Sequence, residues 1–152
     1  MWLLRRMKST NIEPEIILDY YIKEIRIIAE HGVAIWNSGL TVKQVQTLEN
    51  IQKVALKIIM GDQYTTYEKA RTNFGLKLLS ERREDLCINY ALKLFQSKYC
   101  STFFTLATQN VATRNKNLVV EPFCNTKKCY LAPHSYLARL VNQNSGKLNL
   151  RS

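Results

Sequence analysis

Two cysteines and a histidine follow one another at short, regular spacings near the C-terminal end, and their side chains are of the types that bind zinc in proteins. Cys124, Cys129 and His134 are each five residues apart. Thiolates and imidazoles are preferred Zn²⁺ ligands, and a closed structural site needs four of them. The fourth ligand must come from a distance, from Cys100 or His31. The segment is thus a candidate metal site without a local fourth ligand. The alternative is a pair of small half-buried thiols beside a surface imidazole.

The acidic and nucleophilic side chains form no pattern that supports catalysis. Phosphoryl transfer assisted by metal ions requires clustered carboxylates, but Asp19, Asp62 and Asp85 are far apart. Glu84 and Asp85 fall in the first turns of a predicted helix, where acidic groups stabilise the helix dipole. Nothing in the sequence pairs either histidine with a cysteine as a nucleophile and its base. We therefore predict a protein that is not an enzyme and needs no cofactor.

Basic residues are in excess and occur in clusters. The chain has 22 Lys and Arg residues against 12 Asp and Glu residues, a net charge of +10. Such a balance favours an anionic partner, either nucleic acid or an acidic membrane surface. The clusters are Arg5 with Arg6, Lys53 with Lys57, Arg82 with Arg83, and Lys127 with Lys128. We predict that these residues bind nucleic acid, although each cluster alone is also compatible with a solvated helix face.

Apolar periodicity predicts the helices that position these clusters. The first residues predict the end of a helix with an apolar face formed by Trp2, Leu3, Leu4 and Met7. Pro14 favours the start of a second helix, because its missing N–H is not needed in the first turn.

In this second helix, Ile17, Tyr21, Ile25 and Ile28 recur at spacings of four and three residues. This spacing places them on one side of a helix and predicts an amphipathic element that buries them.

Capping signals mark the elements that follow. Thr41 and Gln44 match a capping box, and Gly61 stands where a left-handed cap is expected to end that helix. Thr65 with Glu68 is a second capping box that opens a short helix.

Ser80 is expected to cap a further long helix. We therefore predict a mainly α fold, a small bundle of about four helices over residues 1–98.

The last third of the chain lacks this periodicity and is the most basic part. Residues 99–152 carry seven Lys or Arg residues and one acidic residue. Only residues 136–141 suggest a short helix or docked segment. We predict an irregular basic tail over residues 99–152, distinct from the bundle.

The sequence predicts no contact with a membrane. The longest apolar region, residues 16–35, is interrupted by charged side chains and does not fit a transmembrane helix. The four cysteines are too few and too irregular for a disulfide framework, and they are compatible with a reducing compartment. We predict an intracellular chain.

Several segments, taken in order, resemble one known family. The strongest is Leu48–Gly61, LENIQKVALKIIMG, which is similar to the family pattern LE-x-VQ-(K/R)-x-AL-(K/R)-I-I-x-G. The others, in family order, are Trp2–Lys8, Ala29–Thr41, Tyr64–Tyr67, Gly75–Cys87 and Tyr136–Asn142. Together they resemble the region after the palm of reverse transcriptases from non-LTR retrotransposons, the jockey-like elements of animals in particular. The likeness extends over nearly the whole chain, and its specificity lies in the order and spacing of the pieces.

The resemblance implies a helical thumb and the segment beyond it, which in such enzymes packs on the palm and grips the template–primer. The candidate residues for contact with the template–primer are Arg5, Arg6, Lys53, Lys57, Arg82 and Arg83. The polymerase signature of an aromatic residue, any residue and two adjacent aspartates is absent. The resemblance therefore implies a truncated fragment of an RNA-directed DNA polymerase from a transposable element, with residual, sequence-independent binding of RNA or DNA. The family's habit of copying into chromosomes implies a nuclear location.

An alternative function is protein recognition by an independently folded helical module. Tyr20, Val33, Ile35 and Trp36 are the apolar residues that would face the palm in a complete enzyme. A large apolar patch exposed on a monomer marks an interface or an aggregation hazard. If these side chains are exposed, they predict a partner protein or self-association.

Overall fold

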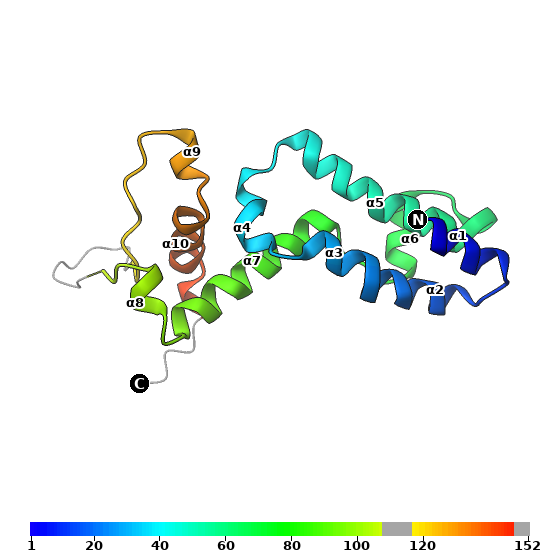
Figure 1. The fold of residues 1–152 in the computed structure, drawn as a ribbon, viewed down its shortest axis with the longest axis horizontal. Helices are drawn as coiled ribbons and strands as arrows, with labels where there is room; N and C mark the ends of the chain where they lie inside the picture. The colour runs from blue at the N-terminus through cyan, green and yellow to red at the C-terminus, as the bar shows by residue number, and fades with distance from the viewer. Residues whose placement is uncertain (108–116, 148–152) are drawn as a thin grey trace. The chain divides into compact units, whose positions relative to one another are not determined.

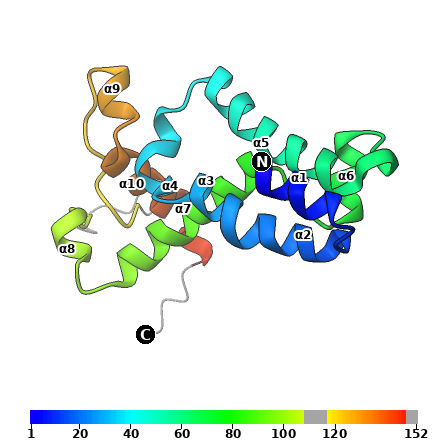
Figure 2. The ribbon, with the colours of Figure 1, turned by 45° about the vertical axis from the view of Figure 1, so that its right-hand side comes forward.

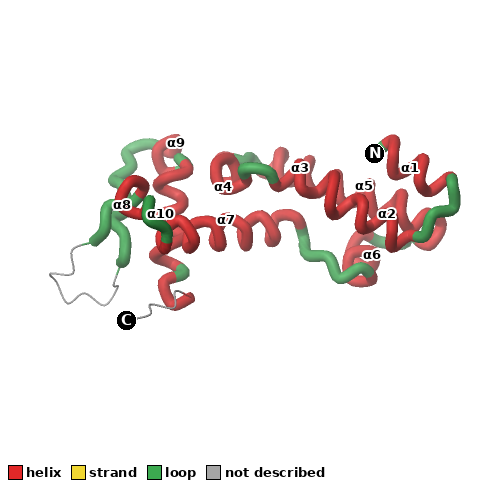
Figure 3. The backbone as a smooth tube through the Cα atoms, turned by 60° about the horizontal axis from the view of Figure 1, so that its bottom comes forward, coloured by secondary structure: helices red, strands yellow, loops and turns green. Residues whose placement is uncertain are grey.

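The structure, a computed structural model, describes residues 1–107 and 117–147. Within these ranges the chain forms helices and loops, and the only β-type pairing is an isolated bridge between Leu106 and Val119 (Figure 3). In the same part of the chain, no helix combines the length and the apolar character needed to cross a membrane. The predicted mainly α fold is confirmed.

Helices are more numerous than the four that were predicted. In chain order (Figure 1) they are α1 (Trp2–Ser9), α2 (Pro14–Tyr20), α3 (Ile27–Glu30), α4 (Val33–Trp36), α5 (Val42–Met60), α6 (Tyr67–Asn73), α7 (Leu79–Gln96), α8 (Cys100–Phe103), α9 (Lys127–Tyr130) and α10 (Pro133–Gln143). A π-helical segment, Tyr21–Arg26, joins α2 to α3, and 3-10 turns occupy Asn37–Gly39, Gly61–Gln63 and Ser145–Lys147. The predicted count is too low because the one-turn helices are too short to show apolar periodicity.

The chain divides into two compact units. Unit 1 comprises residues 1–31 and 41–82, and unit 2 comprises residues 32–40 and the chain after Arg82. The division therefore falls inside α7, and it differs from the predicted boundary at residue 98. Of the predicted tail, residues 108–116 and 148–152 lie outside the described part of the chain.

Unit 1 has its core where α1, α2 and α6 pack against α5 (Figure 2). The buried side chains of this core are Leu4, Ile17, Tyr21, Ala55, Leu56, Ile59 and Ala70. Because α5 contacts each of the other three helices, its apolar side forms the centre of the unit.

The helix predicted from Pro14 is present, but its middle is π-helical. Ile17 and Tyr21 are buried as expected, whereas Ile28 is 77% exposed. A π-helical turn contains more residues than an α-helical turn. The α-helical spacing used for the prediction therefore no longer directs Ile28 towards the core.

α5 begins with the predicted capping box. The Thr41 hydroxyl accepts a hydrogen bond from Gln44 N at 3.3 Å, and Gln44 Oε1 accepts one from Thr41 N at 2.9 Å. After the helix, Gly61 has a φ of 57°, which side chains with a Cβ rarely adopt. Its ψ of −125° is not that of the left-handed cap that was predicted, so Gly61 ends the helix in a different conformation.

Two other predicted helix starts are displaced, that of α6 by one residue and that of α7 by two. Thr66, and not Thr65, caps α6, because its hydroxyl accepts a hydrogen bond from Lys69 N. α7 begins at Leu79, so Ser80 lies inside the helix and does not cap it.

Unit 2 has a core of its own, to which the predicted tail contributes. The short helix expected at residues 136–141 is the longer α10, whose Leu137, Ala138 and Val141 are buried in one cluster with Cys87 and Ala91 of α7. Part of the region predicted to be irregular is therefore ordered, because α10 has an apolar face that it buries.

The packing of α5 leads to a stability prediction. Leu56 is completely buried in unit 1. Leu56→Ala should lower the free energy of unfolding by about 2–5 kcal/mol, because it loses buried methyl groups and leaves a cavity. Val42→Ala changes the same helix at a side chain that is 88% exposed, and should shift the value by less than about 0.5 kcal/mol. Urea titration followed by circular dichroism measures both, and equal effects would contradict the described packing.

Candidate nucleic-acid interface

Arg5 and Arg6 are carried by α1, which two neighbouring residues hold against unit 1. Leu4 is fully buried, and Lys8 Nζ donates a hydrogen bond to the Ile59 carbonyl of α5 at 2.8 Å. Arg5 and Arg6 are exposed, and no carboxylate among the described residues forms an ion pair with either. α1 therefore presents two unpaired guanidinium groups to solvent.

Lys53 and Lys57 are exposed on α5 and lie one turn apart, about 6 Å along the helix axis. Lys43, Gln46 and Asn50 precede them at alternating spacings of three and four residues, so all five share one side of the helix. Gln46 Nε2 donates to Asn50 Oδ1 at 3.2 Å. This side of α5 therefore carries three ammonium groups and two amides. Lys43 was not among the predicted residues, although its spacing in the sequence identifies it.

Trp2 is a second residue that was not among the predicted binding residues. The sequence predicted only that it belongs to an apolar helix face. Its side chain is 74% exposed, and of the apolar face predicted for α1 only Leu4 is fully buried. Trp2 precedes Arg5 and Arg6 by three and four residues, so the three side chains share one side of α1. An exposed aromatic ring beside cationic groups is the arrangement on which unpaired bases stack.

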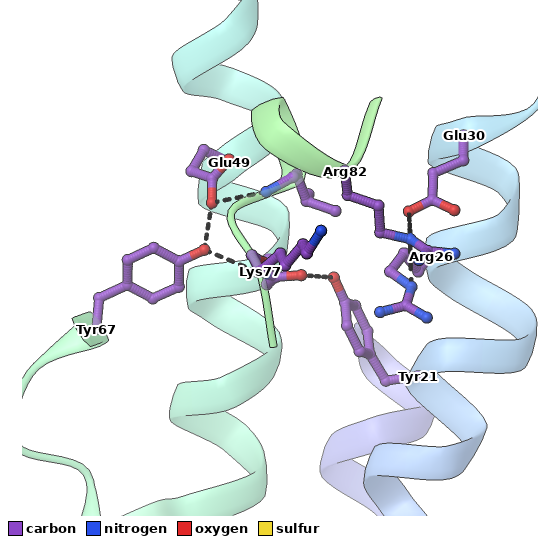
Figure 4. A network of polar contacts seen from close by, with 9 residues as sticks. Tyr21, Arg26, Glu30, Glu49, Tyr67, Lys77 and Arg82 are labelled. Carbon is purple, nitrogen blue, oxygen red and sulfur yellow. Dashed lines mark hydrogen bonds and ion pairs between the residues drawn. The ribbon is translucent and has the colours of Figure 1, made fainter. Parts of the chain in front are cut away.

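The only acidic residue of α5, Glu49, is directed towards Tyr67 and the start of α7 (Figure 4). Its Oε1 accepts hydrogen bonds from the Tyr67 hydroxyl and, at 3.2 Å, from Leu79 N. Burial raises the pKa of Tyr67, and the hydrogen bond to the Glu49 carboxylate raises it further. Glu49 thus joins α5 to the starts of α6 and α7, and its carboxylate is bonded there although it lies one turn before Lys53.

Gln52 bonds to three residues of the same network. It is completely buried, and its Nε2 donates to Tyr67 Oη at 2.9 Å and to the Lys77 carbonyl at 3.0 Å. Its Oε1 accepts a hydrogen bond from the Tyr21 hydroxyl at 3.4 Å, and burial raises the pKa of Tyr21. These bonds fix the rotation of α5 about its axis. Because Gln52 points inward, the adjacent Lys53 faces solvent.

The structure places Arg82 in an interior ion pair of unit 1. Its Nε lies 2.6 Å from Glu30 Oε1, and Arg26 Nε lies 3.6 Å from the same oxygen (Figure 4). Burial lowers the pKa of Arg26, and the neighbouring charge of Arg82 lowers it further. Arg82 is therefore held in an ion pair with a carboxylate that it shares with Arg26, which the sequence could not show because Glu30 is 52 residues away.

Arg83, in unit 2, is only 1% exposed. Its Nε donates to Asn37 Oδ1 at 3.2 Å. The side chain contributes to the interior of the unit and cannot reach a phosphate without leaving it. Adjacent positions on α7 point in different directions, so a pair of arginines in sequence does not make a pair on the surface.

Lys127 and Lys128 are exposed on the one-turn helix α9. They belong to unit 2, whereas the basic residues of α1 and α5 belong to unit 1. They remain candidates for contact with an anion, and the interface proposed below does not depend on them.

The three candidate zinc ligands, Cys124, Cys129 and His134, are not brought together. Cys124 Sγ and Cys129 Sγ lie 2.8 Å apart. Within residues 1–107 and 117–147, however, no group of three or more His, Cys, Asp or Glu side chains is placed to hold a metal ion. Pro133 begins α10, and His134 in its first turn is exposed to solvent instead of joining the two sulfurs.

The four apolar residues predicted to face a palm do not form an exposed patch. Val33 is buried and Trp36 packs on the core of unit 2, while Tyr20 packs on the core of unit 1. Only Ile35, at 67%, is largely exposed. The folded units therefore bury most of the surface on which the predicted protein-interaction module depends.

Comparison with known proteins does not assign the chain to a family. No protein-family model, no curated protein and no solved structure matches it. The candidate interface therefore rests on the described side chains and on the resemblance seen in the sequence.

The network around α5 leads to a second stability prediction. Tyr67→Phe removes the hydroxyl that donates to Glu49 and accepts from Gln52. Because both partners stay inside the protein, the free energy of unfolding should fall by about 1–3 kcal/mol. Tyr90→Phe removes a hydroxyl from a side chain that is 47% exposed and should change it by less than about 0.5 kcal/mol. Losses of the same size in both variants would show that the network does not stabilise unit 1.

Proposed function

We propose that this chain binds nucleic acid through the phosphate backbone, using the exposed basic residues of α1 and α5. One observation carries the proposal: the outer side of α5 holds Lys43, Lys53 and Lys57 in one stripe that no carboxylate interrupts. Arg5 and Arg6 of α1, which packs against α5, add two further unpaired charges. An excess of unpaired cations on neighbouring helices is the usual electrostatic footprint of a nucleic-acid-binding surface.

The side chains on this surface recognise phosphate and not base sequence. Lysine ammonium groups on a helix surface act as point charges that neutralise phosphates and release counterions. Sequence is read by side chains that hydrogen-bond to base edges in a groove. On the described surface of α5, the polar side chains besides the lysines are the amides of Gln46 and Asn50. Binding should therefore be independent of sequence and strongly dependent on salt.

The resemblance to the reverse transcriptases of non-LTR retrotransposons supports the same proposal. It identifies α5 with the strongest matching segment, Leu48–Gly61, and the thumb of such enzymes grips a template–primer. In this interpretation the chain is a thumb region that retains affinity for RNA and DNA without the aspartates of a polymerase. The alternative of a protein-interaction module has less support, because Val33, Trp36 and Tyr20 are packed on the two cores.

A charge-reversal experiment tests the role of α5. Lys53→Glu with Lys57→Glu should weaken binding to a short RNA–DNA hybrid by at least about tenfold, as expected for a loss of about 1.4 kcal/mol or more. It should also reduce the slope of log Kd against log salt concentration by about 1.8, because each lost phosphate contact contributes about 0.9. Fluorescence anisotropy at several salt concentrations measures both quantities.

The matched control is Lys93→Glu with Lys98→Glu, which changes the net charge equally on exposed residues of unit 2. It should leave most of the affinity intact. If the control weakens binding as much as the α5 variant, the effect is one of net charge alone and the proposed surface is wrong.

Trp2 leads to a separate prediction about single strands. Trp2→Ala should weaken binding of a single-stranded oligonucleotide by about 1–3 kcal/mol, because a base loses its stacking partner. Binding of a blunt duplex should change much less, since its bases are already stacked on one another. Phe123→Ala removes a ring that is 90% exposed in unit 2 and serves as the control. Equal losses for single strands and duplexes would exclude stacking on Trp2.

A further inference from the structure

Two sulfur atoms of unit 2 lie within bonding reach of each other. Cys124 and Cys129 are free cysteines, and their Sγ atoms are 2.8 Å apart. A disulfide bond is about 2.05 Å long, so the sulfurs need to approach by less than about 1 Å to form one. The other two cysteines, Cys87 and Cys100, make no such contact in the described part of the chain.

Local structure holds the two sulfurs in this position. The Thr126 hydroxyl caps α9 by accepting a hydrogen bond from Cys129 N at 3.2 Å, which sets the turn between the two cysteines. Cys124 Sγ lies 3.4 Å from the Pro122 carbonyl and 3.5 Å from Oγ of the fully buried Ser135. The pair is therefore preorganised by contacts on both sides.

The two thiols differ in their readiness to ionise. The hydrogen bonds from Cys129 and then from Ser135 lower the pKa of Cys124, and the same bond to Cys124 raises the pKa of Cys129. In contrast, burial raises the pKa of Cys87 and of Cys100. Cys124 Sγ accepts the hydrogen bond from Cys129 Sγ and lies 3.5 Å from Ser135 Oγ, so it has two neighbours that can stabilise a thiolate. The thiolate is the nucleophile in thiol chemistry, and this geometry makes Cys124 the attacking sulfur and Cys129 the resolving one.

We propose that Cys124 and Cys129 form a dithiol site that small disulfides, such as oxidised glutathione, convert into an intramolecular disulfide bond. The Cys124 thiolate attacks one sulfur of oxidised glutathione and releases the first glutathione thiolate. Cys129 then loses its proton to solvent, attacks Cys124 Sγ in the mixed disulfide and releases the second glutathione thiolate. The protein gives up two electrons and two protons, and these reduce oxidised glutathione to two molecules of glutathione.

The bond closes a small ring that contains Lys127 and Lys128 and joins α9 to the segment before it. The site lies in unit 2 and does not depend on the nucleic-acid interface proposed for unit 1. It also uses the two candidate zinc ligands for a chemistry that needs no third ligand.

The test uses the full chain, equilibrated in glutathione buffers of increasing oxidised fraction, quenched with acid, alkylated and digested with trypsin. Trypsin cuts after Lys127 and Lys128, so the two cysteines fall on different peptides, residues 117–127 and 129–139. The expected product is a single species in which these peptides are linked, and which separates on reduction. At a fixed concentration of oxidised glutathione, the ratio of disulfide to dithiol should fall with the square of the reduced glutathione concentration, because two glutathione molecules are released.

Two variants complete the experiment. In Cys129→Ser the expected product is the residue 117–127 peptide with glutathione on Cys124, because the resolving thiol is missing. In Cys100→Ser the linked peptides should form as in the wild type. The proposal is overturned if both cysteines of the wild type stay alkylated in excess oxidised glutathione, or if each carries its own glutathione. A disulfide bond that links Cys124 or Cys129 to Cys87 or Cys100 would also overturn the proposal.

Discussion

A buried side-chain amide has no water to bond and must find its partners inside the protein. In unit 1 this requirement falls on Gln52, which is completely enclosed and bonds Tyr67, the Lys77 carbonyl and Tyr21. Its partners come from the π-helical segment, α6 and the loop before α7, so one side chain joins four parts of the unit. If α5 rotated about its axis, all of these bonds would break together, and the helix is therefore held in one orientation.

That orientation decides what α5 shows to solvent. The Glu49 carboxylate is bonded to Tyr67 and Leu79, and the stripe that holds Lys43, Lys53 and Lys57 contains no carboxylate. A helix with mixed charges thereby acquires one cationic side. The electrostatic character of this surface thus follows from hydrogen bonds in the interior, and the stability of unit 1 and the affinity that we propose for an anionic partner would have a common physical origin.

Unit 2 depends on a different constraint, the burial of the apolar side of α10. Leu137, Ala138 and Val141 share a core with α7. The Asn142 side chain accepts hydrogen bonds from Leu118 N and Val119 N and donates to the Val119 carbonyl, so it docks onto α10 the segment that forms the isolated bridge with Leu106. The cysteine pair lies just before this helix, where the cap of α9 and the buried Ser135 meet.

The sequence by itself determined the features that depend on neighbours within a few residues. It predicted the capping box of α5, the helix after Pro14, the cationic spacing of Lys53 and Lys57, and a helix near residues 136–141, because helix periodicity and caps are local. Only the tertiary structure decided which charges are exposed. Arg82 meets Glu30, Arg83 is buried beside Asn37, Trp2 stays in solvent and His134 turns away from the cysteines. Each of these outcomes depends on contacts between distant residues, and a side chain's type does not reveal whether such a contact exists.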